Sequence, residues 1–504
     1  MKARSIMVMG TASHVGKSLT VVGLGRWLAN QGYRVAPFKS QNMSLNSTAT
    51  PDGREIAWSQ AMQAEACRTL PDADMNPVLL KPSGPHRSQI VLQGRPLRDV
   101  SARDYFYGNK ARLWDTVQES YFRLAAQHDV MVVEGAGSPV EMNLKARDIA
   151  NMRVADMADA AVLLVADIER GGVFGSLVGT VDLLEPRERA RVQGLVINKF
   201  RGDPSLFEDG TRWLTERLQI PVWGVVPYLE DLDLEEEDSL GLDHGRYASR
   251  HDADAAVRVV AVRLPHLSNF MDLDPLFRDP RVAVSWADHP EEAQGADAIV
   301  IPGTKNTMDD LGWLAERGWG DQIRHLYDHG TCLLGICGGY QMMGSTVADP
   351  HGVESQAGVR RGLGLTRQRT TLSREKTTRQ VRGVLHPPWP PAPVTAYEIH
   401  MGTTDNPDAL PPLLSIGDRL EGMVAADGRL VGTYLHGLLD NPGFREAWLA
   451  RIAHARQRPL APAQATPEPR ERRDAAYERL AHHLETHLDL GRLTALVGPP
   501  SHRP

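Results

Sequence analysis

The sequence predicts an α/β protein with two successive domains, each built on a parallel β-sheet. Three observations support this prediction. Short apolar runs alternate with helical patterns, a glycine-rich phosphate loop follows the first run, and a glycine-flanked cysteine follows a later one. With 504 residues, the chain is long enough for more than one domain with a hydrophobic core of its own.

The composition excludes several classes of protein. Hydrophobic residues make up 42% and charged residues 24%, which is typical of globular proteins. The net charge of −7 argues against nucleic acid as a partner, because its phosphate backbone requires a basic surface. The three cysteines are too few for a disulfide framework and favour a reducing, cytoplasmic setting. No apolar run is long enough to cross a bilayer, so no membrane partner is expected.

The first domain is predicted at residues 1–230 and is expected to bind a nucleotide. Continuous apolar runs suit strands buried on both faces of a sheet, and they occur at 6–9, 130–133, 161–165 and 195–197. The next segment, 231–256, begins with an acidic stretch that lacks periodicity. We predict that it is an interdomain linker.

The second domain is predicted at residues 257–455. Its strands are expected at 257–262, 282–285, 298–301, 332–335 and 431–435. Residues 456–504 are predicted to form a proline-rich segment and a C-terminal helix over 475–488. Residues 367–393 are polar and then proline-rich, and their pattern predicts no particular element.

The phosphate loop runs from Gly10 to Ser18, between the first strand and a helix predicted over 19–30. Backbone N–H groups of the loop, with Gly10, Thr11 and Gly16 in it, are expected to cradle the phosphates of ATP. Lys17 would reach the terminal phosphoryl oxygens and Ser18 would bind Mg²⁺. A glycine-rich turn without a ligand is the alternative, but Gly-Lys-Ser stands where a strand gives way to a helix.

The length of this loop resembles that of dethiobiotin synthetase and its relatives, which use ATP to convert a carboxylate into an acyl phosphate. The resemblance extends to Glu134 at the end of a predicted strand, and implies that this carboxylate binds Mg²⁺. It also implies that Asn198 reads the adenine. Glu134 could instead cap a turn, and Asn198 could cap its strand. Asp167, which also ends a strand, is a candidate to hold one of the ligands of Mg²⁺ in place.

The cysteine motif of the second domain has the pattern G-x-C-x-G-x-Q, from Gly335 to Gln341. A sharp strand-to-helix turn of this kind exposes a nucleophile beside backbone N–H groups, and a helix N-terminus favours the thiolate of Cys337. The pattern resembles that of class I glutamine amidotransferases, which have a flavodoxin-like α/β fold. The resemblance implies that Cys337 attacks the side-chain amide of glutamine and releases ammonia. Cys67 and Cys332 are expected to be core residues.

The same resemblance identifies the other parts of the glutaminase site. His436, at a predicted strand end, would be the base for Cys337. The oxyanion hole would combine the N–H of Gly338 with that of Gly303 or Thr304. Many class I amidotransferases carry a glutamate two residues after the histidine, where this chain has Leu438. Either a dyad suffices or another residue orients His436, and the run 397–402 could help, line the glutamine pocket or lie between the domains.

Three further runs, 39–47, 75–82 and 264–270, together with these motifs resemble the cobyric acid synthase family over nearly the whole chain. The fold would be a P-loop NTPase-type domain followed by a class I amidotransferase domain. The resemblance implies amidation of the b, d, e and g carboxylates of adenosylcobyrinic acid a,c-diamide, with ATP and glutamine as co-substrates. The likeness of the first half of the chain to dethiobiotin synthetase also makes a homodimer possible.

The run 39–47 forms a dense cluster of amides and hydroxyls that suits a corrinoid rich in amides and carboxylates. Lys39 would neutralise the attacked carboxylate, and Lys81 is a second candidate for the same role. The other residues expected to bind the corrinoid are Gln41, Asn42, Ser44 and Asn46. On spacing alone, the run could equally be a polar loop with asparagine-rich turns.

Two other functions remain open at this stage. One is a different amidating ligase of the same architecture, such as cobyrinic acid a,c-diamide synthase or an enzyme acting on a cell-wall lipid precursor. The other is a nucleotide switch whose amidotransferase-like domain binds without catalysing. The presence of both Cys337 and His436 argues against the switch.

Overall fold

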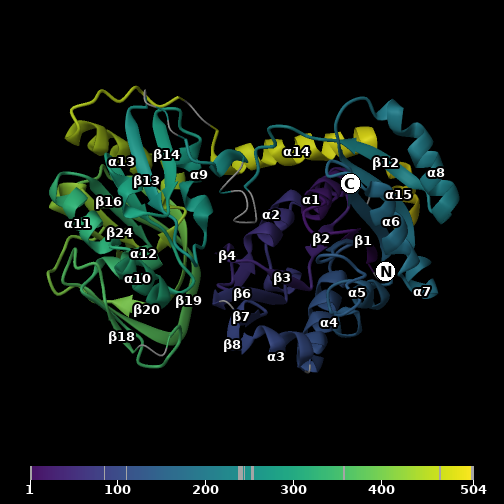
Figure 1. Cartoon of the computed structure of the whole chain (residues 1–504), viewed down its shortest axis with the longest axis horizontal. Helices are drawn as coiled ribbons and strands as arrows, with labels where there is room; N and C mark the ends of the chain where they lie inside the picture. The colour runs from purple at the N-terminus through teal and green to yellow at the C-terminus, as the bar shows by residue number, and fades with distance from the viewer. Residues whose placement is uncertain are drawn as a thin grey trace.

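The computed structural model describes residues 3–84, 86–108, 110–235, 242, 245–250, 252, 255–355, 358–464 and 467–500. Two lobes lie side by side, and a long helix near the C-terminus runs across the top between them (Figure 1). Much of the predicted linker lies outside the described residues, namely 236–241, 243, 244, 251, 253 and 254. The same holds for 465, 466 and 501–504 of the predicted C-terminal segment.

The first lobe is built on a six-stranded parallel sheet in the order β12-β11-β10-β1-β9-β2. Its strands are β1 (Arg4–Gly10), β2 (Val35–Phe38), β9 (Val130–Glu134), β10 (Ala161–Asp167), β11 (Val192–Phe200) and β12 (Val222–Pro227). The four strands predicted from apolar runs are therefore confirmed as β1, β9, β10 and β11, and β9 is buried throughout as such runs require.

The helices of this lobe pack around the sheet (Figure 1). They are α1 (Lys17–Asn30), α2 (Trp58–Ala66), α3 (Ala102–Tyr107), α4 (Ala111–Ala125), α5 (Met152–Ala158), α6 (Val173–Asp182), α7 (Pro186–Arg189) and α8 (Glu208–Leu218). Parallel strands end at one edge of a sheet, so the residues that follow them meet there. Glu134 lies opposite Val8 near the end of β1, and Asp167 lies opposite Asn198.

A small, mostly antiparallel insertion follows β2 and faces the second lobe (Figure 1). It contains a sheet in the order β3-β6-β7-β8 and a separate hairpin, β4-β5. The strands are β3 (Gln41–Met43), β4 (Ser47–Ala49), β5 (Glu55–Ala57), β6 (Val78–Gly84), β7 (Arg87–Leu92) and β8 (Arg95–Ser101). Three of these have only three residues, too few for a periodic signal, so the sequence did not predict the insertion.

The second lobe contains a six-stranded sheet in the order β14-β13-β15-β16-β24-β23. Its strands are β13 (Val257–Val262), β14 (Val282–Ala287), β15 (Ala298–Ile301), β16 (Cys332–Ile336), β23 (Met423–Ala425) and β24 (Leu430–Thr433). Four predicted strands are confirmed as β13 to β16. The helices of this lobe are α9 (Asp274–Phe277), α10 (Thr307–Glu316), α11 (Trp319–Asp328), α12 (Gly338–Met343) and α13 (Pro442–Ala455).

A second, largely antiparallel sheet in the same lobe corrects two expectations. It contains β17 (Thr346–Ala348), β18 (Val359–Arg361), β19 (Arg369–Leu385), β20 (Pro393–Thr404), β21 (Leu414–Ile416), β22 (Arg419–Glu421) and β25 (Leu435–His436). The unassigned segment 367–393 thus contains the 17-residue strand β19. The single strand predicted at 431–435 is wrong, because Glu421 accepts the N–H of Tyr434 and the chain passes there from β24 in one sheet to β25 in the other.

The two helices of the C-terminal segment belong to the core of the first lobe, whereas Arg456, Arg458 and Leu460 before them contact the second lobe. The predicted helix is confirmed as α14 (Pro469–His487), which starts six residues earlier than expected, and α15 (Leu490–Val497) follows it. Helix α14 lies along α1 (Figure 1) and buries Tyr477, Leu480 and Leu484. Among the described helices, none combines the length and apolar character needed to span a membrane.

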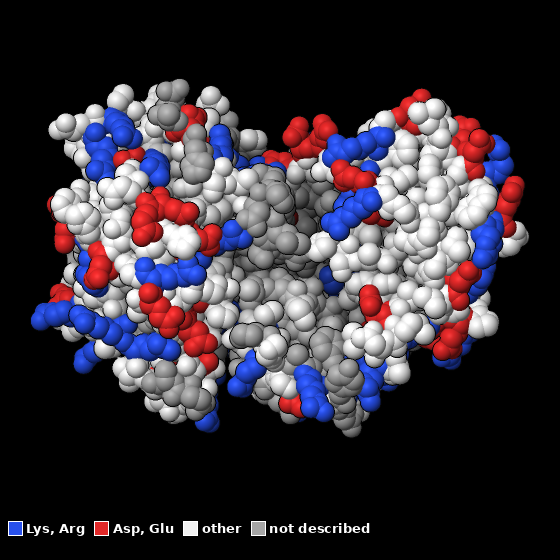
Figure 2. All heavy atoms as spheres, viewed as in Figure 1, with Lys and Arg blue, Asp and Glu red and all other residues white. Residues whose placement is uncertain are grey.

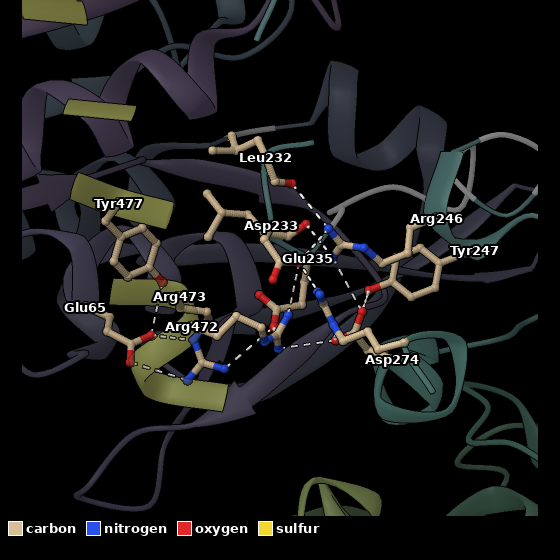
Figure 3. Close-up of polar contacts among 12 residues, drawn as sticks. Glu65, Leu232, Asp233, Glu235, Arg246, Tyr247, Asp274, Arg472, Arg473 and Tyr477 are labelled. Atoms are coloured by element: carbon tan, nitrogen blue, oxygen red, sulfur yellow. Dashed lines mark hydrogen bonds and ion pairs between the residues drawn. The ribbon is translucent and has the colours of Figure 1, made fainter. Parts of the chain in front are cut away.

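A network of ion pairs joins α14 to both lobes (Figure 3). Arg472 lies 3.1 Å from Glu235 of the linker and 3.3 Å from Asp274 at the start of α9. Arg473 lies 2.8 Å from Glu65 of α2. Burial alone would lower the pKa of Arg473. The charges of Glu235 and Glu65 raise this pKa by more than burial lowers it, so the guanidinium stays charged. The helix therefore connects the first lobe, the linker and the second lobe.

The surface in Figure 2 carries Lys and Arg side chains interspersed with Asp and Glu. No single-sign field dominates this face, in agreement with the low net charge.

Candidate functional site

The phosphate loop lies at the mouth of a pocket of about 1170 Å³ in the first lobe. The Lys17 ammonium donates to the carbonyl of Ala12 at 2.9 Å and to that of Gly137 at 3.1 Å. Gly16 opens α1 with a φ of 102°, a conformation that favours glycine. The Asn198 side-chain amide donates to the carbonyl of Val15 at 2.8 Å and so braces the loop from β11.

Glu134 connects three polar side chains around this pocket. Its carboxylate accepts hydrogen bonds from Ser18 at 2.8 Å, from Lys39 at 2.8 Å and from Gln63 at 2.5 Å. The carboxylate and hydroxyl oxygens of Glu134 and Ser18 are ligands that Mg²⁺ accepts. No three His, Cys, Asp or Glu gather for a metal within the described part of the chain, so nucleotide oxygens would have to complete a Mg²⁺ site. Gln63 was missed, because α2 gave no motif.

Asp167 reaches the loop through a lysine. Its carboxylate forms an ion pair with Lys199 at 2.9 Å, and Lys199 donates to the carbonyl of His14 in the phosphate loop at 2.7 Å. Asp167 also accepts the N–H of Glu169 at 2.8 Å. The structure thus pairs Asp167 with Lys199, a lysine that lines the nucleotide pocket.

The polar run 39–47 divides between two places. Lys39, Gln41 and Asn42 line the nucleotide pocket. The Ser44 hydroxyl accepts the N–H of Asn46 at 3.1 Å, and the Asn46 side chain in turn accepts the N–H of Asn269 of the second lobe at 2.8 Å. Asn269 returns the contact by accepting the N–H of Ser47, also at 2.8 Å. Two of the runs singled out in the sequence, 39–47 and 264–270, therefore meet at the boundary between the lobes.

Cys337 lies on the predicted strand-to-helix turn between β16 and α12. Its φ of 53° and ψ of −109° are strained for a residue with a side chain, and such strain is typical of exposed nucleophiles. Gly339 is required beside it, because a Cβ there would come within 1.9 Å of the carbonyl oxygen of Ile301. The Cys337 thiol lies 3.5 Å from the carbonyl of Ile399.

His436 is held by Asp272, a residue that the sequence analysis missed. The Nδ1 atom of His436 lies 2.7 Å from one carboxylate oxygen of Asp272, and the other accepts the N–H of Gly437 at 2.8 Å. Burial lowers the pKa of His436, but the charges of Asp272 and Cys337 raise it more, to about 10. This pKa favours the imidazolium form of His436 at neutral pH. Asp272 follows the run 264–270 by two residues, which is the signal that could have pointed to it.

The run 397–402 is found in all three of the places left open for it. Tyr397 stacks on His436 with ring centroids 5.3 Å apart, and Ile399, His400 and Met401 line the pocket of Cys337. Tyr397 and Ile399 also pack against Ala49 of the first lobe, at the boundary between the lobes. Glu398 does not reach the histidine. It is buried and bonded to Arg379 and Arg419.

The expected oxyanion donors lie together. A Cβ placed on Gly338 would come within 3.2 Å of the Thr304 nitrogen, and one on Gly303 within 3.0 Å of His436 Cε1. Two backbone N–H groups near the nucleophile meet the geometric need of an oxyanion hole. Gly338 as one donor, and Gly303 or Thr304 as the second, remain predictions.

Lys81 lies apart from the other residues expected to bind the corrinoid. It lines the pocket of Cys337, together with Asn269, Lys305 and Lys376. A side chain of the first lobe therefore contributes to the pocket of the second lobe.

A nucleotide pocket and a Cys-His-Asp site on one chain define a glutamine-dependent ligase that uses a nucleotide. Comparison with known families agrees. Residues 6–240 match the family described as the CobQ/CobB/MinD/ParA nucleotide binding domain. Residues 258–444 match the CobB/CobQ-like glutamine amidotransferase domain.

Full-length relatives make the assignment specific. The cobyric acid synthase of Sorangium cellulosum is 47% identical over 99% of this chain and 99% of its own length. That of Roseiflexus castenholzii is 48% identical over 90% and 92%, and that of Chloroflexus aurantiacus 45% identical over 96% and 97%. The chain belongs to the cobyric acid synthase family.

Proposed function

We propose that this chain amidates the b, d, e and g carboxylates of adenosylcobyrinic acid a,c-diamide in cobalamin biosynthesis, with ATP and glutamine as co-substrates. Membership of the cobyric acid synthase family supports the corrinoid as substrate. The observation that carries the proposal is the run 39–47, which lines the nucleotide pocket at one end and contacts the rim of the glutaminase pocket at the other.

The first half-reaction would take place beside Glu134. Lys17 and the loop N–H groups hold the phosphates, while Lys39 lies 2.8 Å from Glu134 and close enough to receive the carboxylate of the corrinoid. An oxygen of this carboxylate attacks the γ-phosphorus of ATP, ADP leaves, and an acyl phosphate forms. Pocket residues with exposed apolar side chains, Leu19 and Met43, suit the corrinoid ring.

The second half-reaction would use the Cys-His-Asp site. The Cys337 thiolate attacks the side-chain carbonyl carbon of glutamine, and backbone N–H groups stabilise the oxyanion. The imidazolium of His436 gives its proton to the departing amide nitrogen, which leaves as ammonia. Water then releases glutamate from the thioester. Asp272 holds the ring in the orientation that this proton transfer requires.

Ammonia would then pass within the protein to the acyl phosphate, displace phosphate and leave a primary amide. The shared run 39–47 supports an internal route. Free labelled ammonium in the medium should therefore not exchange fully with the product nitrogen during turnover with glutamine.

Three finer points belong to the proposal. Ser18 and Glu134 would bind Mg²⁺, which supplies positive charge beside the phosphates. The protein would act in the cytoplasm. It would form a homodimer, which light scattering of the purified protein can test.

The experiment is mass spectrometry of adenosylcobyrinic acid a,c-diamide after incubation with the protein, Mg·ATP and glutamine. A ladder that ends at four added amides is expected. Cys337→Ala should abolish the ladder driven by glutamine but retain one driven by ammonium, whereas Cys332→Ala, in the buried strand that leads to Cys337, should keep both. If the corrinoid is unchanged while glutamine is still hydrolysed, the corrinoid is not the substrate, but the glutaminase role stands.

A further inference from the structure

A buried carboxylate joins two lysines of different lobes beside the pocket of Cys337. Glu55 of β5 lies 2.7 Å from the ammonium of Lys81 on β6, and 2.5 Å from that of Lys376 on β19. Both lysines line the pocket with Cys337. Neither the nucleotide chemistry nor the Cys-His-Asp site accounts for this trio.

The trio carries excess positive charge. Burial raises the pKa of Glu55, but the two ammonium groups lower it below its ordinary range, so it is ionised. Burial lowers the pKa of Lys81 to about 8, which still leaves it largely protonated at neutral pH. Two cations against one anion leave one positive charge in excess, on side chains that are at most 6% exposed. A buried excess charge is costly unless an anion neutralises it.

Lys81 has the geometry to hold such an anion. An ammonium group donates three hydrogen bonds, and in the described part of the chain Lys81 donates two, to Ser47 at 2.8 Å and to Glu55. The anion must enter the pocket of Cys337. Glutamine carries an α-carboxylate at one end and, at the other, the amide that Cys337 would attack.

We infer that Lys81, with Lys376, binds the α-carboxylate of glutamine and determines the specificity of the glutaminase site. The inference rests on the proposed role of Cys337 and deepens it. Glu354, which lines the same pocket and accepts the N–H of Met308 at 3.2 Å, is the matching carboxylate for the α-ammonium group. Glutamine binding then requires a residue of the first lobe, so the glutaminase pocket is complete only when the lobes are docked.

The test is steady-state hydrolysis of glutamine by the full chain with Mg·ATP, with L-glutamine and L-glutaminamide compared as substrates. L-glutaminamide has an uncharged carboxamide in place of the α-carboxylate. Lys81→Met should raise the KM for glutamine at least about 10-fold with kcat changed less than about 3-fold, in line with loss of a charge-assisted hydrogen bond. The preference for glutamine over glutaminamide should fall by a similar factor, and Lys81→Arg should restore part of it.

Lys145→Met is the matched control, because Lys145 also pairs with a largely buried carboxylate, Glu188 at 2.6 Å, but lies outside the pocket. It should leave KM and preference unchanged. If Lys81→Met does not fold, Lys376→Met provides the same test, since removal of either lysine leaves a neutral pair. A folded variant with unchanged preference would overturn the inference.

The outcomes also separate this inference from the proposed function. A changed preference without any corrinoid amidation would support Lys81 and contradict the substrate. A wild-type protein that hydrolyses no glutamine under these conditions would overturn both.

Discussion

The nucleotide pocket and the glutaminase pocket are built in different ways. The nucleotide pocket draws its phosphate-binding residues from consecutive positions, 10–18, and is completed by the ends of β9, β11 and β12, by β3 of the insertion, by α2 and α14 and by part of the linker. The glutaminase pocket takes Cys337 from a turn, His436 from a short strand of another sheet and Asp272 from a 3₁₀ turn far along the chain. It also takes Lys81 from the other lobe.

Because the two pockets are built differently, the two activities depend to different degrees on the contact between the lobes. Phosphate binding requires one loop and one helix, which the first lobe provides alone. Glutamine hydrolysis requires residues of both sheets of the second lobe and a wall supplied by the first. We therefore expect the nucleotide site to be insensitive to the docking of the lobes and the glutaminase site to respond to it.

The largest expected effect is that of Lys17→Met, which should abolish most of one activity and leave the other in place. Lys17→Met should lower ATP-dependent amidation by about 10³-fold, because a preorganised charge on the transferred phosphoryl group is lost. Glutamine hydrolysis should stay within a few-fold of the wild type. Parallel assays of ADP and glutamate release measure both. Equal losses in the two assays would break the comparison, since they would mean that the pockets act as one.

Asp272→Asn should lower the kcat of glutamine hydrolysis by about 10²-fold, because the ring of His436 loses its orienting anion. The pKa of His436 is raised to about 10 in the folded protein, from 6.5. Its contribution to stability is therefore fully present below pH 6.5 and lost as the pH rises through about 10. In Asp272→Asn the burial of the ring would lower this pKa, so the alkaline limb of the pH–rate profile should move to lower pH.

Glu398→Gln is the matched control for Asp272→Asn. It removes a buried carboxylate of β20, the strand that pairs with the strand of His436, but one that bonds Arg379 and Arg419 and not the histidine. It should reduce stability but leave the pH–rate profile in place. A shift of the profile equal to that of Asp272→Asn would contradict the assignment of Asp272.

Asn269→Gly should loosen the contact between the lobes and leave both chemistries working. Glycine keeps the left-handed φ of 54° and removes the acceptor for the N–H of Ser47, together with one side chain at the wall of the Cys337 pocket. Loss of one hydrogen bond, about 1 kcal/mol, should raise the glutamine hydrolysed per amide formed by a few-fold. Asn406→Ala, which removes a comparable contact within one lobe, should leave this ratio unchanged.

The smallest effect concerns stability alone. Tyr477→Phe removes the hydroxyl that donates to Glu65 at 3.0 Å, within the first lobe. It should lower the free energy of unfolding by about 1 kcal/mol without changing either activity, as thermal denaturation and the two assays would show. A change in glutamine hydrolysis would mean that α14 controls the second lobe as well.

The sequence by itself determined the features that are local in the chain. Apolar runs of three to six residues identified eight parallel strands of the two six-stranded sheets, because a strand buried on both faces is apolar throughout. The phosphate loop and the turn of Cys337 were found because their glycines serve backbone geometry within a few residues. The domain boundaries and the roles of the individual site residues remain predictions.

Only the tertiary structure decided which distant residues share a site. Asp272 reaches His436, and Lys81 enters the pocket of the other lobe, through contacts that span 164 positions in the first case and two lobes in the second. Neither contact leaves a periodic or motif signal, because spacing along the chain reports only neighbours on one element. The place of α14 against α1 was hidden for the same reason: its apolar positions predict a buried face but not the surface that covers it.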